Sequence, residues 1–158
     1  EFDAANIKPR DLYETYLPAF ETLVKEGKVK EVMCAYNRFE GDPCCGSDQL
    51  LMHILREEWG YEGIVVSDCG AINDFYKEKG GHKTHPDAAS ASADAVLSGT
   101  DLECGGSYKS LKESVEKGLI KEEDIDALAL DAYNDACRPG NPREVSVEDI
   151  IAIYRSLM

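Results

Sequence analysis

Residues 63–71 read Gly-Ile-Val-Val-Ser-Asp-Cys-Gly-Ala, and the expected fold class follows from this segment. Three consecutive β-branched residues, at positions 64–66, predict a short strand that is buried on both faces, as in a parallel sheet. The strand ends at Asp68, and Gly70 lets the backbone turn. Parallel α/β folds place their active sites at the carboxyl ends of their strands. Asp68 is therefore either a catalytic carboxylate or the N-cap of the next helix.

Outward from this stretch, hydrophobic periodicity predicts helices that alternate with strands. Expected strands cover 29–36, 64–66 and 98–104, and expected helices cover 9–26, 48–59, 71–79, 87–97, 107–117, 121–137 and 147–157. Pro18 is expected to kink the first helix, and Ser146 with Asp149 has capping-box spacing at the last. The fold class is α/β with parallel strands. A closed (β/α)8 TIM barrel needs about 250 residues, so this chain is expected to form part of one.

Composition narrows the class of partner. The chain has 158 residues and carries 31 acidic against 17 basic residues, for a formal net charge of -14. This balance argues against nucleic acid or an anionic membrane as a partner, because the phosphate-neutralising patch is missing. No apolar run is long enough to span a bilayer.

The cysteines and histidines do not suggest a metal centre. The six cysteines include no Cys-x-x-Cys pair, and Cys34 and Cys104 are expected to be buried thiols. His82 and His85 lie in a polar loop without a third ligand nearby, and His53 is expected on the exposed side of a helix. No metal site and no cofactor are therefore expected.

Two motifs carry a resemblance to a known family. Residues 32–38 (Val-Met-Cys-Ala-Tyr-Asn-Arg) and 65–72 (Val-Val-Ser-Asp-Cys-Gly-Ala-Ile) resemble glycoside hydrolase family 3. This family contains β-glucosidases, β-xylosidases and related exo-acting enzymes. Residues 11–20, 50–63 and 95–103 are similar to further family segments in the same order. The resemblance covers about residues 1–137 and implies the C-terminal portion of a TIM-barrel domain.

The resemblance implies roles for three residues. Asp68 aligns with the family's catalytic nucleophile, Tyr36 with a tyrosine beside that carboxylate, and Met33 with a methionine of the sugar pocket. The implied function is retaining hydrolysis of a β-glycoside, in which the aspartate forms a glycosyl-enzyme that water then releases. A retaining enzyme also needs a second carboxyl group about 5–5.5 Å from the nucleophile.

The chain has no counterpart to some segments that the family resemblance would lead one to expect. The first half of the barrel and the second domain, which commonly supplies the acid/base, have no counterpart here. Asp74, Asp101 and Glu103 are weighed as the missing acid, with a structural role favoured for each. The isolated chain is expected to be feeble or inactive unless another chain, a second copy or the remainder of the enzyme, completes the barrel. Residues 138–158 are expected to form a linker and a terminal helix of unknown role.

Two other function classes stand beside this interpretation. One is a non-catalytic half-barrel fragment or an oligomeric carbohydrate-binding scaffold, because an open half-barrel exposes strand edges and core residues. The other is an aldolase, which ranks low because a Schiff base requires a lysine and no expected strand ends in one.

The cysteines near the implied nucleophile suggest a disulfide. Cys69 follows Asp68, and Cys44 and Cys45 lie in the loop after the neighbouring strand. The flanking residues resemble the xylosidase-leaning branches of the family. A Cys45–Cys69 or Cys44–Cys69 disulfide is the hypothesis, and free thiols are the alternative. A disulfide would favour a periplasmic or secreted protein.

Overall fold

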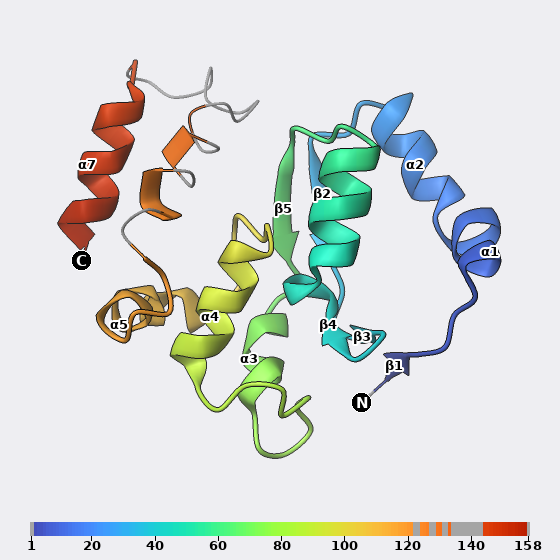
Figure 1. The fold of residues 1–158 in the computed structure, drawn as a ribbon, viewed down its shortest axis with the longest axis horizontal. Coiled ribbons are helices and arrows are strands. Elements are labelled where there is room, and N and C mark those ends of the chain that lie inside the picture. The colour runs from blue at the N-terminus through green and yellow to red at the C-terminus, as the bar shows by residue number, and fades with distance from the viewer. Residues whose placement is uncertain (1, 122–123, 127–128, 131–132, 134–143, 158) are drawn as a thin grey trace.

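Two parallel strands lie at the centre of the computed structural model, which describes residues 2–121, 124–126, 129–130, 133 and 144–157. They are β2 (Glu31–Cys34) and β5 (Ile64–Ser67), and Figure 1 shows them side by side. Their register pairs Glu31 with Ile64 and Cys34 with Ser67. A single parallel bridge adds Leu102 beside Val66. The carboxyl ends of these segments therefore meet at one edge.

A second sheet, of three two-residue strands, and a series of helices surround this pair. The small sheet has the order β1 (Asp3–Ala4), β3 (Arg38–Phe39), β4 (Asp42–Pro43), with β1 parallel and β4 antiparallel to β3. The helices are α1 (Pro9–Asp11), η1 (Leu12–Tyr16), α2 (Pro18–Lys25), η2 (Cys44–Gly46), η3 (Gln49–Glu58), α3 (Ala71–Tyr76), α4 (Ala88–Leu97), η4 (Ser107–Ser110), α5 (Leu111–Glu116) and α7 (Val147–Leu157).

Local sequence explains where several helices begin. Pro18 opens α2, so the helix expected over 9–26 is divided into α1, η1 and α2. Asp87 begins α4 with a reciprocal capping box to Ser90. Ser146 begins α7 in the same way, since its hydroxyl accepts from the Asp149 amide while the Asp149 carboxylate accepts from the Ser146 amide. The expected capping box is confirmed.

The strands bury one face and leave the other open. Cys34, Val65 and Ser67 are buried against a core that includes Ile72 and Phe75. On the opposite face, Met33, Val66 and Leu102 form one row across the three segments, because paired residues of parallel strands point the same way. Met33 is 57 % exposed and Leu102 is 53 % exposed. This open row consists of apolar residues that no described helix covers.

The structure confirms the α/β class with parallel strands and corrects some of its details. The described residues do not close a barrel, and the strand expected over 98–104 is reduced to the bridge at Leu102. Gly99, at φ 96°, turns the chain just before it. Much of the helix expected over 121–137, and the 137/138 domain boundary, lie outside the described residues.

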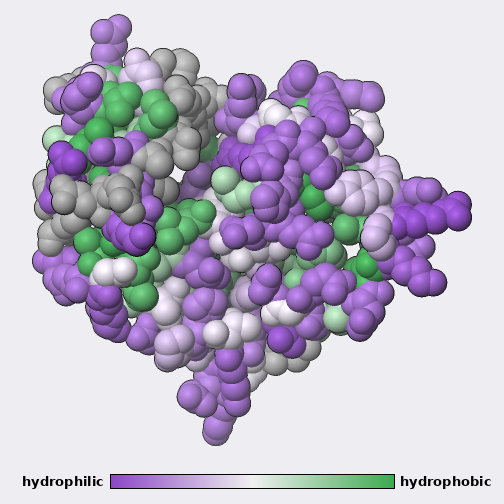
Figure 2. Space-filling model, viewed as in Figure 1, coloured by the Kyte–Doolittle hydropathy of each residue, from purple (hydrophilic) through white to green (hydrophobic). Residues whose placement is uncertain are grey.

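The hydrophilic surface is consistent with the large number of charged residues in the sequence. Figure 2 shows a face that is mostly hydrophilic, with hydrophobic residues at the left around α5 and α7. In the part of the chain that the structure describes, no helix combines the length and apolar character needed to cross a membrane.

Candidate active site at the strand ends

Asp68 lies directly after β5 and is partly buried at the shared carboxyl edge of the strands. Its amide donates to the Cys34 carbonyl (3.1 Å), which extends the β2–β5 ladder by one residue. Its carboxylate accepts from the Cys69 amide at 2.7 Å. Strand alternation places Asp68 on the same face as Val66, the open face.

The helix-capping alternative for Asp68 is wrong. The N-cap of α3 is Gly70, in the left-handed region at φ 82°, and α3 has no side-chain capping bond. Only the Asp68 backbone carbonyl accepts from Ala71 (3.0 Å). A residue with a side chain would be strained at position 70, so the glycine is what turns the chain after the strand. The Asp68 carboxylate is therefore available for a task other than starting the helix.

Tyr36, which follows the neighbouring strand β2, contacts the loop that carries Asp68. Its hydroxyl donates to the backbone carbonyl of Cys69, and its side chain is 42 % exposed. The structure thus brings Tyr36 to the residue after Asp68, with its hydroxyl on a peptide carbonyl. Its backbone carbonyl, in turn, lies 2.7 Å from Nε2 of His82, a contact that the sequence interpretation missed.

Met33 lies deeper on the same open face. It pairs with Val66, two residues before Asp68, and its side chain is exposed. Its role in a sugar pocket stays a prediction.

The expected cysteine pairing is wrong. Among the described residues the cysteines form two disulfides, Cys34–Cys45 and Cys69–Cys104. Neither Cys45 nor Cys44 is therefore bonded to Cys69, and Cys34 and Cys104 are not free thiols. The loop after β2 turns back under the strand, which buries Cys45 completely and brings its Cα within 5.1 Å of the Cα of Cys34. Thr100 fixes this turn by donating to the Cys45 carbonyl at 2.7 Å.

Cys69 faces the other way, at the exposed rim. Its partner Cys104 follows Leu102 at the same edge of the strands, with the two Cα atoms 4.4 Å apart. The position of Cys104 at the end of a third strand-like segment was the signal that could have suggested this pairing. Cys44 is a buried free thiol, and burial raises its pKa to about 11, so it is unreactive at neutral pH.

Each of the three carboxylates weighed as the missing acid has a structural partner. Asp101 accepts from Arg56 and from the Val65 amide, both at 2.7 Å. Glu103 accepts from the amides of Ser107 and Tyr108, each at 2.7 Å, and so caps η4. Asp74 lies 3.7 Å from Lys77 on α3.

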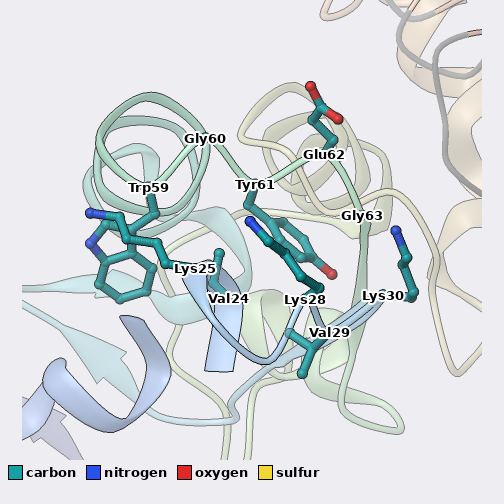
Figure 3. A pocket seen from close by; sticks show the side chains of 10 residues that line it. All are labelled: Val24, Lys25, Lys28, Val29, Lys30, Trp59, Gly60, Tyr61, Glu62 and Gly63. Atoms are coloured by element: carbon teal, nitrogen blue, oxygen red, sulfur yellow. The ribbon is translucent and has the colours of Figure 1, made fainter. Parts of the chain in front are cut away.

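A pocket of about 130 Å³ lies at the opposite end of the strands. Figure 3 shows that its lining comes from Lys25 at the end of α2, from Lys28 and Lys30 in the turn before β2, and from Trp59 and Tyr61 before β5. Because these residues precede the strands and Asp68 follows them, this pocket is not part of the strand-end site. The histidine loop and the described carboxylates also form no cluster that could hold a metal ion, considering the described residues only.

The geometry defines a class of protein: an α/β segment with a carboxylate at a strand end and a tyrosine that contacts the residue after it. A family model for the glycosyl hydrolase family 3 N-terminal domain matches residues 1–130. The chain belongs to this family.

Similar proteins agree with this assignment. The chain is 57 % identical over 123 residues to a xylan 1,4-beta-xylosidase of Xylanibacter ruminicola, covering 77 % of this chain and 14 % of that protein. It is 41 % identical over 143 residues to a probable exo-1,4-beta-xylosidase of Aspergillus terreus, covering 88 % and 18 %. The chain therefore spans less than a fifth of the length of these relatives.

Solved structures show the same likeness. A family 3 exo-beta-xylosidase in complex with a xylobiose aziridine probe is 28 % identical, with a TM-score of 0.69, covering 98 % of this chain and 22 % of that one. A beta-glucosidase involved in saponin metabolism from intestinal bacteria is 29 % identical, with a TM-score of 0.71, covering 98 % and 21 %.

A second family model, for the C-terminal part of Fe-containing alcohol dehydrogenases, matches residues 106–158. This is a third of the chain and does not show membership. Imidazole is a common ligand of iron, and residues 106–158 contain no histidine.

Proposed function

We propose that this chain is the nucleophile-bearing part of a retaining exo-β-xylosidase, and that residues 1–137 supply the C-terminal portion of its TIM-barrel domain. The observation that carries the proposal is Asp68 at the carboxyl edge of two parallel strands, with a carboxylate that does not cap the next helix. Relatives named as xylosidases support xylose as the sugar that is released. A structural neighbour named as a beta-glucosidase makes glucose the alternative sugar to test.

In the proposed reaction, an oxygen of the Asp68 carboxylate attacks the anomeric carbon of a terminal β-xyloside. The bond from that carbon to the leaving oxygen breaks as an acid protonates the oxygen, and an ester to Asp68 forms. Water, deprotonated by the same group, then attacks the anomeric carbon and frees Asp68, so the configuration is retained. The Cys69 amide holds one carboxylate oxygen and thereby directs the side chain.

The acid/base is proposed to come from polypeptide outside this chain. Asp101 and Glu103 are each committed to holding backbone amides and, for Asp101, an arginine. Moving either would leave buried amide donors unpaired, at about 1–3 kcal/mol each. This chain alone is therefore proposed to be a feeble catalyst, with a second chain as the partner that completes the barrel. Two disulfides support a periplasmic or secreted location.

A pair of substrates tests the proposal. An aryl β-xyloside with a dinitrophenyl leaving group needs no acid to depart, whereas xylobiose does. We expect the purified chain to release dinitrophenolate slowly and to leave xylobiose intact. Asp68→Ala should abolish the slow release, and the matched control Asp74→Asn should keep it. Equal release by Asp68→Ala would contradict the nucleophile, and robust cleavage of xylobiose would contradict the missing acid/base.

A non-catalytic, self-associating half-barrel remains the second candidate because of the open row Met33, Val66 and Leu102. An exposed apolar surface of this kind favours association with another chain. Sedimentation velocity separates the candidates: an oligomer that never reacts with the activated xyloside supports a scaffold, and an oligomer that reacts supports an assembled enzyme.

A further inference from the structure

His82 is connected to the proposed site by two hydrogen bonds that share Tyr36. Its Nε2 lies 2.7 Å from the Tyr36 backbone carbonyl, and the Tyr36 hydroxyl donates to the carbonyl of Cys69, the residue after Asp68. A carbonyl oxygen can only accept, so Nε2 carries the proton of this hydrogen bond. The contacts therefore run in sequence from the imidazole to the carbonyl of Cys69, the residue after Asp68.

The loop that carries His82 is held in place from α3. The His82 amide donates to the Asp74 carbonyl at 2.6 Å, and the amides of Thr84 and His85 both donate to the Phe75 carbonyl. Gly81 is buried, and a Cβ there would lie 2.3 Å from the Lys77 carbonyl oxygen. The backbone on either side thus fixes where the His82 ring can go.

Stability alone does not explain this placement. Nδ1 of His82 is buried and has no hydrogen-bond partner among the described residues. Burying an unpaired polar atom is unfavourable by about 1–3 kcal/mol. The one hydrogen bond that the ring makes within the described protein is directed at the backbone of Tyr36.

We infer that His82 is a positioning residue for the proposed reaction: through Nε2–H it fixes Tyr36, and through Tyr36 the Cys69–Gly70 peptide of the loop that carries Asp68. This inference rests on the proposed function. Small displacements of a reacting group by distant changes lower rates up to about 100-fold. Loss of the Nε2–H donor should therefore slow attack by Asp68 while the fold persists.

The test measures labelling of the purified chain by a 2-deoxy-2-fluoro-β-xyloside with a dinitrophenyl leaving group, followed by intact mass. His82→Ala should label about 10- to 100-fold more slowly than wild type. His82→Gln, whose amide nitrogen can replace Nε2–H, should recover most of that rate. His53→Gln is the matched control, because His53 is exposed on η3 and pairs only with Glu57 in the described structure. Circular dichroism checks that each variant is folded.

Two further readouts do not depend on labelling. Imidazole nitrogen NMR should show His82 protonated at Nε2 and not at Nδ1. Hydrogen exchange at the amides of residues 69–71 should accelerate in His82→Ala and not in His53→Gln. If wild type takes no label, the proposed function of the isolated chain fails, and these two readouts decide the inference.

Three results would overturn it. The first is that His82→Ala is labelled, and exchanges its amides at residues 69–71, at the same rates as wild type. The second is that folded His82→Ala and folded His82→Gln lose the same fraction of the labelling rate. The third is that the neutral His82 ring carries its proton on Nδ1.

Discussion

Cys69 and Cys104 form a disulfide directly beside Asp68, and it joins the loop after β5 to the segment after the Leu102 bridge. Both residues are exposed, whereas Cys34 and Cys45 form a disulfide inside the core. One chain thus holds an accessible bridge at the proposed site and a protected bridge beneath it. A reducing agent can therefore reach Cys69–Cys104 in the folded protein more easily than Cys34–Cys45.

Mild reduction should therefore open the bridges in order. We expect a dithiol reductant to reduce Cys69–Cys104 in the folded protein and to leave Cys34–Cys45 intact until the chain unfolds. Alkylation followed by peptide mass spectrometry reads which cysteines react. Simultaneous alkylation of all four in folded protein would contradict the prediction.

The exposed bridge should also contribute more to stability. It closes a loop with a sequence separation of 35, against 11 for the buried bridge. The chain-entropy model gives about 4 kcal/mol for the longer loop and about 3 kcal/mol for the shorter. Cys69→Ser with Cys104→Ser should lower the free energy of unfolding by up to the larger amount, measured by urea denaturation. An unchanged midpoint would contradict this expectation.

Asp101 should matter for stability and not for chemistry. Its carboxylate accepts from the amide of fully buried Val65 and from Arg56. Asp101→Ala should cost about 2–3 kcal/mol, because a buried amide loses its partner and a partly exposed ion pair is broken. Asp74→Ala, the control, breaks only a long ion pair with Lys77 and should cost less than about 1 kcal/mol.

Urea denaturation gives both values. Labelling of folded Asp101→Ala at the wild-type rate would agree with the structural role. A folded variant that is stable but no longer labelled would instead assign Asp101 to the reaction.

Asp87 should make stability depend on acid pH. Hydrogen bonds from Lys117 and then from Ser90 hold its pKa well below the ordinary value of 3.8. A carboxyl group whose pKa is lowered by folding stabilises the protein above its unfolded pKa, and this contribution is lost as the pH falls from there toward the folded value. Asp87→Asn keeps a capping side chain and removes the charge.

We therefore expect Asp87→Asn to melt below wild type by a constant interval between about pH 5 and 7, with the interval shrinking below about pH 4. Thermal unfolding followed by circular dichroism measures the interval. An interval that is the same at pH 3 and pH 7 would show that the charge is not responsible.

The sequence predicted the elements whose signals are local. The β-branched run before Asp68 forms β5, and Ser146 with Asp149 begins α7 as a capping box. The length of the strand expected over 98–104 was overestimated. Gly99 turns the chain, and only Leu102 of the described segment pairs with β5, through one parallel bridge to Val66. Such a contact depends on the neighbouring strand and not on the local residues.

The cysteine pairing and the contact between His82 and Tyr36 could not be predicted from local signals. Cysteine connectivity is not deducible from spacing, and here the loop after β2 folds back under its own strand and carries Cys45 away from Cys69. His82 reaches Tyr36 across 46 positions of sequence, through a loop held by backbone hydrogen bonds. Neither relationship leaves a periodic signal in the sequence.

The most direct test of the central claim is the position of the label left by the 2-deoxy-2-fluoro-β-xyloside with a dinitrophenyl leaving group. Protein is digested after labelling, and the modified residue is located by tandem mass spectrometry. We expect an ester on Asp68, with the glucoside analogue labelling the same residue more slowly. A label on any other carboxylate, or none in folded protein at saturating reagent, would contradict Asp68 as a competent nucleophile in this chain.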